Sequence, residues 1–570
     1  MVSDLLTKRA EQIFPKLTPA QIARLEAHGR RVATRAGDVL VEPGEPHRDL
    51  LVVLSGSLQA LVPGVLGEEL ITTLSPGDFT GELSTLRGVA GFVRIQVREG
   101  GEVLALDEHS LRDLVQTDAE LSELFMRAFI LRRMGLMSAG QSAVMLMGSR
   151  YSADTLRLQK FLTRNAYPYV NVDIEADPGV QALLDRFHVA AADIPVVIGP
   201  RGRLLKKPSI HDMAEFLQMN PAVDDRVIHD LVVVGAGPAG LAAAVYAASE
   251  GLDVFVTEAI APGGQAGTSS RIENYLGFPT GISGQALASR ALVQAQKFGA
   301  KVNVAAIATR LHCERRPYSV ELSDGRVVHA SSVIIATGAK YRGLELDNLS
   351  RFVGSGVHYA ATHLEAKLCQ GEQIAIVGGG NSAGQAAVFL ASGCQHVHIL
   401  VRSDGLADSM SRYLIRRIEE SSNITLHART QITALEGSDR LQRVLWRTQT
   451  DAREQTHEMG HVFLMTGAVP NTRWLQGCVA LDDKAFVRTG PDLQAQDLAV
   501  AGWPLSRPPH LLETSLPGVF AVGDVRSGSV KRIASAVGEG SICVQFVHRT
   551  LREVSVPSAQ PATSSSAAAA

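Results

Sequence analysis

The chain begins with short apolar runs that are separated by turn-forming residues. Runs such as "DLLVVLSGSLQALV" and "ELITTL" are divided by "PGE", "SGS" and "SPGD", combinations that favour strands joined by tight turns. Two stretches with helical apolar periodicity flank these runs, Leu5 to Leu25 and "LSELFMRAFILRRMGLM". The pattern predicts a small β-barrel or sandwich with flanking helices over residues 1–140.

A second region, residues 141–222, alternates strand and helix patterns. It predicts a strand ("AVMLM"), a helix ("ADTLRLQKFLTRN"), a strand ("YVNVDI") and a helix ("GVQALLDRFHV"). A strand ("DIPVVI"), a turn ("GPRGR") and a final helix ("IHDMAEFLQM") follow. This order is typical of a compact α/β unit, and "NPAVDDR" links it to the next region.

From residue 228 onward, a strand, a glycine-rich turn and a helix follow one another twice, near residues 231 and 374. Two such units predict two Rossmann-like nucleotide-binding domains in one polypeptide. The sequence therefore predicts a multidomain chain, as its 570 residues already suggest. The low-complexity end, residues 553–570, is predicted to be disordered.

Charge and cysteine content narrow the class of protein. A formal net charge of −3 gives no electrostatic reason to expect nucleic acid or an anionic membrane as a partner. The five cysteines include no CxxC pair, which argues against a disulfide scaffold and a metal site and suits a reducing cytoplasm. The N-terminus lacks the apolar core of a signal peptide. Glycines and a proline interrupt the apolar run from Leu231 to Ala248, which argues against a membrane span.

The first glycine-rich turn carries Gly235, Gly237 and Gly240 in G-x-G-x-x-G spacing. In a dinucleotide-binding fold the first glycine makes the turn, the second admits the pyrophosphate, and the third lets the helix pack on the strand. Glu258 ends the next predicted strand, where an acid accepts hydrogen bonds from an adenosine ribose. The arrangement predicts dinucleotide binding, with a purely structural turn as the alternative.

The second turn, "IAIVGGGNSAGQAAVFLASGCQHVHILVR", has Gly378, Gly380 and Ala383 in the same three positions. Arg402 stands where the first copy has Glu258. A cation there pairs with a 2′-phosphate and cannot accept from a 2′-hydroxyl, so NADPH is favoured over NADH. The alternative is a solvated surface arginine.

Further motifs give residues 228–550 a resemblance to the thioredoxin reductase family of flavoenzymes. The matching stretches, in the family's order, are "GGQ", "IENYLGFP", "IIATGAKYR", "LMTGAVPNT" and "LPGVFAVGDVR". The resemblance implies an FAD-binding domain made of residues 228–342 and 476–552, split by an NAD(P)H-binding domain over residues 343–475. It also implies a homodimer.

The resemblance places cofactor contacts at further positions. For FAD they are Gly264, Gln265, Asn274, Thr337, Gly338, Gly523, Asp524, Ile533 and Ala534. For NADPH they are Asn381 and Ser382, beside the glycines already named.

The chain departs from this family at its redox centre. The family's "YCATC" reads "YAATH" here, so Ala360 and His363 replace both cysteines, and Leu364 replaces the acid that follows. Neither replacement can form a disulfide, so the relay from flavin to dithiol is lost. His363 is either a proton donor beside the flavin or a polar filler. The family's "HRR" is reduced to an arginine between Val401 and Ser403, with Arg412 as a possible substitute partner.

The second region resembles a thioredoxin or glutaredoxin fold. Pro195 in "DIPVVI" matches that fold's cis-proline, so a cis peptide bond is implied there. Ser152 and Thr155 stand at CxxC spacing but carry hydroxyls, which cannot shuttle electrons at neutral pH. The region is therefore interpreted as a docking or scaffolding module.

The first region resembles a cyclic-nucleotide-binding domain, with "GEL" at Gly81 to Leu83 matching the phosphate-binding loop. The family's phosphate-pairing arginine is replaced by Gly91 and Phe92, and Arg94 has the wrong alternation on a strand. Arg87 on the loop could compensate. Cyclic nucleotide binding therefore stays open, beside a different ligand or a purely structural regulatory role.

Together these features predict an FAD-dependent, NADPH-oxidising reductase without an internal CxxC. Its acceptor would be a protein disulfide, such as that of a thioredoxin-like protein, a quinone or oxygen. The competing hypothesis is a non-catalytic redox sensor that signals through the N-terminal domains.

Overall fold

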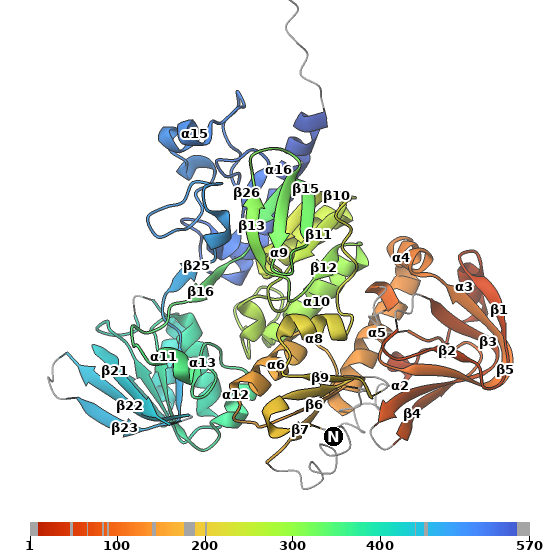
Figure 1. The fold of residues 1–570 in the computed structure, drawn as a ribbon, viewed down its shortest axis with the longest axis horizontal. Coiled ribbons are helices and arrows are strands. Elements are labelled where there is room, and N and C mark those ends of the chain that lie inside the picture. The colour runs from red at the N-terminus through yellow and green to blue at the C-terminus, as the bar shows by residue number, and fades with distance from the viewer. Residues whose placement is uncertain are drawn as a thin grey trace, which may run out of the picture.

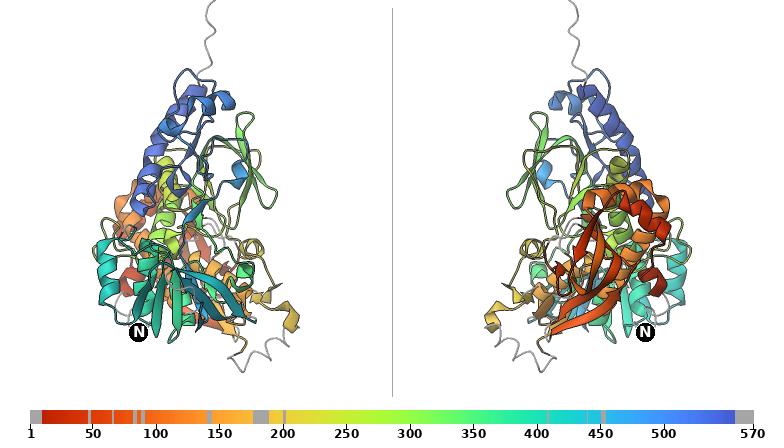
Figure 2. Two further views of the ribbon diagram at one scale, coloured as in Figure 1. Left: turned by 90° about the vertical axis from the view of Figure 1, so that its left-hand side faces the viewer. Right: turned by 90° about the vertical axis from the view of Figure 1, so that its right-hand side faces the viewer.

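The structure is a computed structural model in which four sheet-containing units lie side by side (Figure 1). It describes residues 10–45, 49–64, 67–81, 85–87, 91–139, 144–175, 189–199, 202–407, 409–438, 440–449 and 454–555. Figure 2 views the molecule from both sides, with the inserted unit facing the viewer on the left and the N-terminal sheet on the right.

The N-terminal unit is an antiparallel sheet of order β1-β5-β3-β4, with β2 pairing to β5. Its strands are β1 (Arg30–Thr34), β2 (Val39–Val41), β3 (Leu50–Gly64), β4 (Gly67–Leu74) and β5 (Arg94–Leu106). Its helices are α2 (Ala10–Ile13), α3 (Pro19–Glu26), the short η1 (Thr85–Arg87), α4 (Glu108–Thr117) and α5 (Ala119–Ala139). A core of Phe79, Phe125 and Phe129 joins sheet and helices.

The predicted helix from Leu5 to Leu25 is wrong as a single element. Two short helices, α2 and α3, replace it in the described residues. The break comes where Thr18 caps α3 through a reciprocal capping box with Gln21 and Pro19 takes the first turn. A proline at that position favours a helix start over a helix interior.

The second unit has a four-stranded sheet of order β7-β6-β8-β9, with β6 and β7 parallel and the remaining pairs antiparallel. Its elements are β6 (Met145–Gly148), α6 (Ala153–Arg164), β7 (Val170–Asp173), η2 (Ala191–Asp193), β8 (Val196–Ile198), β9 (Leu204–Lys206) and α8 (Ile210–Phe216). They follow the predicted order. The helix expected at "GVQALLDRFHV" lies almost wholly outside the described residues. The Ile194–Pro195 bond is cis, as predicted.

The third unit is a seven-stranded sheet of order β12-β11-β10-β15-β14-β13, with β26 added in parallel to β15. Its N-terminal part contains β10 (Ile228–Val234), α9 (Pro238–Ser249), β11 (Val254–Thr257), η4 (Ala266–Thr268), α10 (Gly284–Lys297), β12 (Lys301–Asn303), β13 (Ala308–His312), β14 (Tyr318–Leu322) and β15 (Val327–Ile335). Its C-terminal part contains η5 (Arg473–Leu475), η6 (Gly490–Asp492), α15 (Ala495–Ala501), β26 (Val519–Ala521), η7 (Gly523–Val525) and α16 (Ile533–Ser555). The sheet is thus completed by chain from both sides of an insertion.

Two paired strands, β16 (Ala339–Tyr341) and β25 (Ala468–Pro470), carry the chain into and out of the inserted unit. That unit has a parallel sheet of order β17-β24-β18-β19-β20 and an antiparallel β21-β22-β23 sheet. Its strands are β17 (Val357–His358), β18 (Gln373–Val377), β19 (His396–Leu400), β20 (Ile424–His427), β21 (Thr430–Gly437), β22 (Leu441–Thr448), β23 (Gln455–Glu458) and β24 (His461–Leu464). Its helices are α11 (Leu349–Phe352), α12 (His363–Leu368), α13 (Asn381–Ala391) and α14 (Arg412–Glu420). The predicted pair of Rossmann-like units is confirmed.

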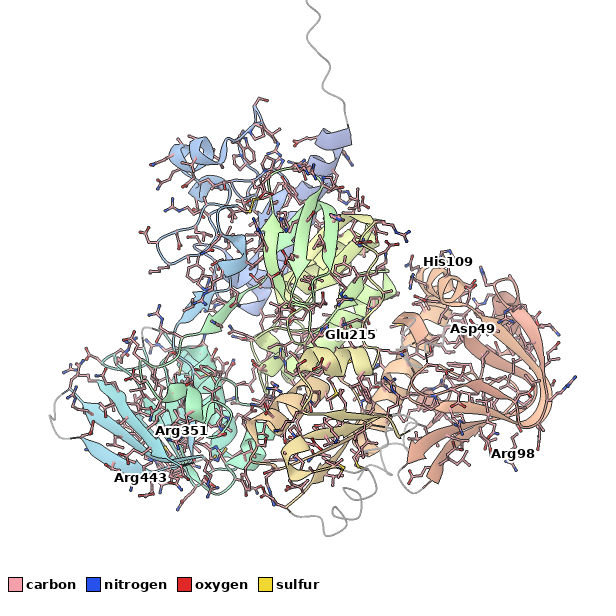
Figure 3. All side chains as sticks on the ribbon, in the orientation of Figure 1. Asp49, Arg98, His109, Glu215, Arg351 and Arg443 are labelled. Atoms are coloured by element: carbon pink, nitrogen blue, oxygen red, sulfur yellow. A yellow bond between two sulfur atoms is a disulfide. The ribbon has the colours of Figure 1, made fainter. Side chains whose placement is uncertain are left out.

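The units meet through polar side chains as well as through their cores. Figure 3 shows Glu215 of α8 at the border of the second and third units, where its carboxylate lies 3.9 Å from the guanidinium of Arg326. None of the helices in the described part of the chain combines the length and apolar character needed to cross a lipid bilayer.

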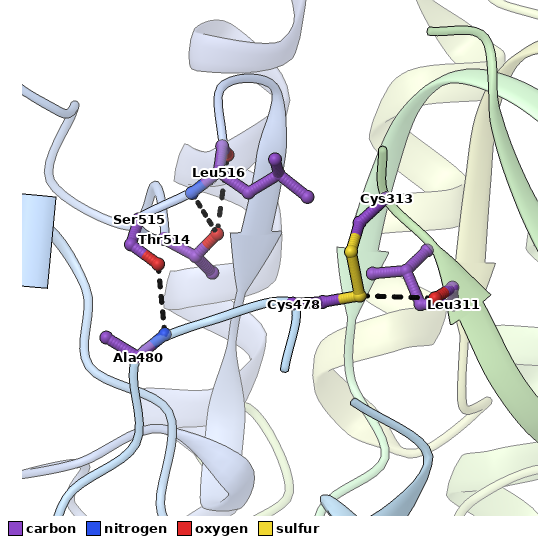
Figure 4. Close-up of a disulfide and its surroundings, with 7 residues drawn as sticks. All are labelled: Leu311, Cys313, Cys478, Ala480, Thr514, Ser515 and Leu516. Atoms are coloured by element: carbon purple, nitrogen blue, oxygen red, sulfur yellow. Dashed lines mark hydrogen bonds between the residues drawn. A yellow bond between two sulfur atoms is a disulfide. The ribbon is translucent and has the colours of Figure 1, made fainter. Parts of the chain in front are cut away.

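The cysteine spacing argued against a disulfide scaffold, yet the structure holds one disulfide in its described residues. Cys313 and Cys478 are joined by a disulfide within the third unit, with their Cα atoms 5.8 Å apart (Figure 4). Their separation of 165 residues hid the pair from a search for CxxC spacing. Cys313 follows β13 and Cys478 follows η5, two segments that the inserted unit separates in sequence and the fold brings together.

Candidate functional site

The first glycine-rich loop has the shape that the sequence predicts. Gly235 has a φ of 107°, and a Cβ there would lie 2.4 Å from the Ala336 carbonyl oxygen. A Cβ on Gly240 would lie 1.8 Å from the Gly235 carbonyl oxygen. Gly237 is the N-cap of α9 without a side-chain hydrogen bond, and a Cβ there would meet only the Gly264 Cα, at 3.9 Å. The loop thus presents bare backbone N–H groups at a helix N-terminus, which fits a pyrophosphate.

Glu258 is buried beside this loop and is held by backbone donors. Its carboxylate accepts from the backbone N–H of Ala236 at 2.8 Å, of Ile260 at 3.0 Å and of Ala261 at 3.3 Å. These bonds fix both oxygens at the edge of the glycine loop. Oε2, which accepts only the Ala236 N–H, keeps a lone pair with which it could also accept a ribose hydroxyl.

The residues that the resemblance adds gather around this loop, with one exception. Gly264 lies close against Gly237, because a Cβ added to Gly264 would lie only 3.0 Å from the Gly237 Cα. Gln265 donates its side-chain amide to the Ala339 carbonyl oxygen. Asn274 is exposed to solvent.

The Thr337 hydroxyl donates to the backbone oxygen of Asn471 at 2.8 Å, and the Asn471 side chain donates to the Thr337 oxygen at 2.9 Å. The backbone oxygen of Gly338 accepts from the Asn471 N–H at 3.1 Å. These bonds tie the entry and exit of the inserted unit together.

The C-terminal contribution to this site comes from η7 and α16. Asp524 is half-buried, and burial raises the pKa of its carboxyl despite the nearby Lys531 ammonium. Gly523 donates its N–H to Glu539 at 2.6 Å. Ile533 and Ala534 begin α16, which packs against α9 of the glycine loop.

The second loop repeats the geometry in the inserted unit. Gly378 has a φ of 138°, and a Cβ there would lie 2.3 Å from the Met465 carbonyl oxygen. Gly380 caps α13 and faces open space, while Ala383 is fully buried. The Asn381 side chain is already engaged, because it accepts from the Ser411 N–H at 2.7 Å.

The loop's flank is basic and open. Ser382 is exposed on the first turn of α13. Arg402 is exposed two residues after β19, and it has no ion-pair partner among the described residues. Arg412 is exposed at the first position of α14. Both cations are therefore available to a phosphate on the outer face of the loop.

The "YAATH" segment leads into α12. Ala360 precedes the helix, Thr362 caps it through a capping box with Glu365, and His363 is its first residue. The imidazole of His363 is exposed and lies edge-on to the Phe389 ring, with ring centroids 5.3 Å apart.

Helix α6 of the second unit lies directly against α12 (Figure 1). The ammonium of Lys160 is 2.8 Å from the Glu365 carboxylate, whose side chain is only 1% exposed. Burial alone would raise the pKa of the Glu365 carboxyl, but Lys160 and Thr362 hold it below its usual range. His358 lies in the same buried cluster, and burial lowers the pKa of its imidazole to about 3, with help from His461 and Lys160.

The two ends of α6 contact both nucleotide-binding units. At its N-terminal end, the Arg440 guanidinium lies over the Tyr151 ring, 5.7 Å from the ring centroid. Ala153 packs closely on Gly354, because a Cβ added to that glycine would lie 3.3 Å from the Ala153 Cβ. At its C-terminal end, Arg164 donates to the Gly264 carbonyl oxygen at 3.0 Å, beside the first glycine loop. The helix therefore bridges the third unit and the inserted unit.

The hydroxyls at CxxC spacing have structural positions. Ser152 is the N-cap of α6 and accepts from the Thr155 backbone N–H. Thr155 is fully buried. Sequence analysis missed the contacts that α6 makes and missed Glu365, which the T-x-x-E spacing of "THLE" could have marked as a capping residue.

A second pair of cysteines, also missed from the sequence, lies in the inserted unit. Cys369 ends α12, and its Sγ is 3.6 Å from the Sγ of Cys394. Both thiols are buried. These two thiols lie close together, as the two cysteines of a CxxC would, but at the opposite end of α12 from Ala360.

In the N-terminal unit the predicted alternation of Arg94 is confirmed. Its guanidinium pairs with Glu42 at 3.0 Å and with Glu68, on the outside of the sheet. Phe92 is buried at the position where the resemblance expects a phosphate-pairing arginine. Residues 82–84 of the "GEL" loop and the side chain of Arg87 lie outside the described part.

Comparisons with known proteins agree with this organisation. Residues 229–540 match the family model described as pyridine nucleotide-disulphide oxidoreductase, and residues 31–118 match the model of a cyclic nucleotide-binding domain. NADPH-dependent thioredoxin reductase 3 of Arabidopsis thaliana is 33% identical over 334 residues, which are 57% of this chain and 59% of that protein. Thioredoxin reductase of Bacillus subtilis is 27% identical over 332 residues, 58% of this chain and 98% of that protein.

Solved structures show the same likeness. Thioredoxin reductase of Lactococcus lactis in its FR conformation has a TM-score of 0.51 and 25% identity, covering 57% of this chain and 99% of that one. Thioredoxin reductase of T. acidophilum has a TM-score of 0.50 and 29% identity over the same shares. The likeness to thioredoxin reductases is thereby confirmed for the two Rossmann-like units. Since the first family model spans more than half of the 570 residues, the chain belongs to the pyridine nucleotide-disulphide oxidoreductase family.

Proposed function

We propose that this chain is an FAD-dependent, NADPH-oxidising reductase that delivers electrons to an external acceptor without a dithiol of its own at the "YAATH" segment. One observation carries the proposal: two glycine cradles of dinucleotide shape stand on either side of a segment that holds Ala360 and His363 in place of cysteines. When bound, NADPH supplies a hydride and FAD accepts and passes on the electron pair.

The roles of the chain follow from where its residues lie. The third unit, residues 228–342 and 476–552, would hold FAD on the N-terminus of α9, with Glu258 at the ribose and Asp524 from η7. The inserted unit, residues 343–475, would hold NADPH on the N-terminus of α13, with Arg402 at the 2′-phosphate. Each helix N-terminus offers unpaired N–H groups and a partial positive charge to a pyrophosphate.

We infer that the second unit is a thioredoxin-like module that docks without taking part in electron transfer. Its Ser152 and Thr155 hydroxyls serve as a cap and a core residue of α6, so it offers no thiol. Its α6 covers the side of α12 that carries Glu365. An acceptor would therefore approach the flavin by another face, and the N-terminal units would regulate the reductase.

The test is reduction followed by turnover. The purified protein is mixed anaerobically with NADPH while flavin absorbance is followed, and an acceptor is then added: a thioredoxin disulfide, a quinone or oxygen. We expect rapid bleaching and steady reoxidation by at least one of these acceptors. A flavin that bleaches but is reoxidised by none of them would favour the redox sensor, and a flavin that NADPH cannot bleach would contradict both.

The nucleotide preference rests on Arg402. A charge-assisted hydrogen bond to a phosphate is worth about 1.5–3 kcal/mol, so Arg402→Ala should raise KM for NADPH by about 10-fold or more and leave KM for NADH nearly unchanged. Arg416→Ala removes an equally exposed cation from α14 as a matched control. Equal effects of R402A on both nucleotides would overturn the assignment.

His363 is the remaining candidate in the vacated position. Because its imidazole is exposed and rests only on Phe389 among the described rings, we infer that it is a polar surface residue. His363→Ala should leave the rate of flavin reduction by NADPH within about 2-fold of wild type, whereas a proton donor would typically cost 100-fold or more. The homodimer and the cytoplasmic location stay predictions.

A further inference from the structure

A cavity of about 340 Å³ lies in the N-terminal unit between the sheet and α5. Its walls come from α2, from the four strands β2 to β5, from the Phe79–Gly81 loop and from one face of α5. The volume falls within the range of small-molecule sites, about 300–1,000 Å³. Gly81, which begins the "GEL" stretch that resembles a phosphate-binding loop, lines this cavity.

The walls are apolar at the places where a cyclic nucleotide needs polar partners. Phe92, which replaces the phosphate-pairing arginine, lines the cavity and is 5% exposed. Its ring packs edge-on against Tyr167 of the second unit, with centroids 4.9 Å apart. Val93 and Ile95 also line the cavity, whereas Arg94 between them points outward to Glu42. A cyclic phosphate placed against Phe92, where the resemblance expects its arginine partner, would face hydrocarbon and lose its hydration without compensation.

One cation lines the cavity in the described residues, and it is Arg132 of α5. Its Nε donates to the Ile13 carbonyl oxygen and its Nη1 to the Gly81 carbonyl oxygen, each at 2.9 Å. The guanidinium also lies 4.5 Å from the centre of the Phe79 ring. Its Nη2 has no protein partner among the described residues.

The charge of Arg132 is not neutralised by a direct partner. No described carboxylate lies within ion-pair distance of its guanidinium, and Asp78 acts on it only from farther away. Burial lowers the pKa of Arg132 to about 10, so the group still carries its charge at neutral pH. The polar wall residue Thr80 is already bonded, because its hydroxyl accepts from the Leu51 N–H at 3.0 Å. Among the residues that the structure describes, the cavity therefore combines largely apolar walls with one positive charge.

We propose that this cavity binds an apolar ligand with a single anionic group, of the class of medium-chain carboxylates, and does not bind a cyclic nucleotide. The anionic group accepts from the free Nη2 of Arg132, and the apolar body lies against Phe92, Ile95 and Leu136. The ligand would thus touch Phe92, whose ring also packs at right angles to that of Tyr167 in the second unit.

Calorimetric titration of the full-length protein as purified tests the proposal, with decanoate, decanol, cyclic AMP and cyclic GMP as probes. Decanoate should bind at least about 10-fold more tightly than decanol, since only the carboxylate gains a charge-assisted hydrogen bond from Arg132. Neither cyclic nucleotide should give binding heat. Binding of cyclic AMP or cyclic GMP with micromolar affinity would overturn the proposal.

Three variants locate the site. Arg132→Met should remove the preference for decanoate over decanol, and Arg132→Lys should retain most of it. Thr72→Phe places a ring in the cavity and should weaken both probes by about 10-fold or more. Far-UV circular dichroism checks the fold, and T72F answers the question even if R132M unfolds. Decanoate binding that none of these variants changes would refute the site.

Discussion

The ion pair between Lys160 of α6 and Glu365 of α12 offers the sharpest test of how the second unit is attached. Lys160→Met keeps the apolar stem of the side chain and leaves the buried Glu365 carboxylate without its counter-charge. Removing one partner of a fully buried pair typically costs about 3–5 kcal/mol. The Lys160 side chain is 34% exposed, and the Thr362 N–H still donates to Glu365. We therefore expect Lys160→Met to lower the local stability of α12 by about 1–2 kcal/mol.

This loss should appear as local opening of α12, because opening lets the unpaired carboxylate reach water. Hydrogen–deuterium exchange of residues 364–369, measured on the full chain at neutral pH, should accelerate by about 5–30-fold. Arg157→Met is the matched control, since it removes a cation from the same helix whose partner, Asp154, is exposed. It should change the exchange of α12 by less than about 2-fold.

A second variant separates charge from packing. In the double variant K160M/E365Q the neutral amide needs no counter-charge, so most of the protection of α12 should return. Exchange in K160M that equals that of R157M, or a double variant that exchanges as fast as K160M, would refute the idea that this pair anchors α6 to α12.

Three further outcomes follow from the structure. Gly378→Ala should destabilise the inserted unit by about 1–3 kcal/mol, because the φ of 138° and the nearby Met465 carbonyl oxygen oppose a Cβ. Gly380 faces open space, so Gly380→Ala should keep the fold but raise KM for NADPH. Thermal unfolding and steady-state kinetics separate the two outcomes. The pKa of His358 falls from 6.5 to about 3 on folding, so between these pH values the unfolded state binds a proton that the folded state does not. The free energy of unfolding should therefore decrease, by up to about 5 kcal/mol, as the pH falls from 6.5 toward 3. Denaturation at several pH values should show that the free energy of unfolding of His358→Leu depends less on pH. Alkylation of the denatured, unreduced protein should modify Cys369, Cys394 and Cys543 only, and modification of all five cysteines without a reductant would contradict the disulfide.

Much of the nucleotide-binding architecture could be predicted from the sequence because its constraints are local. At Gly235 and Gly378 the backbone has a positive φ, and a side chain would strike the carbonyl oxygen of the residue just past the neighbouring strand. Glycine is therefore required at fixed spacing. The two-residue period of a strand likewise indicated that Arg94 points away from the expected phosphate position, and its guanidinium does pair with Glu42 instead. The cis bond before Pro195 was implied by the resemblance to a thioredoxin fold and is present.

Prediction failed where a local signal was weaker than assumed or where the partner was distant. The apolar period from Leu5 to Leu25 suggested one helix, but the cap at Thr18 and Pro19 divides it. A count of CxxC motifs could not detect the bond between Cys313 and Cys478, since half-cystines need only short Cα separation in space.

By itself the sequence determined that this chain has two glycine-rich turns of the dinucleotide-binding pattern, a "YAATH" segment without cysteines ahead of the second turn, and Gly91 and Phe92 where the resemblance expects an arginine. Only the tertiary structure decided that α6 joins both cradles through Lys160 and Arg164, that Cys369 meets Cys394, and that Arg132 charges an apolar cavity. The reason is physical: periodicity and turn chemistry fix which face a residue presents. Which partner meets that face depends on how distant segments pack, and no local pattern records it.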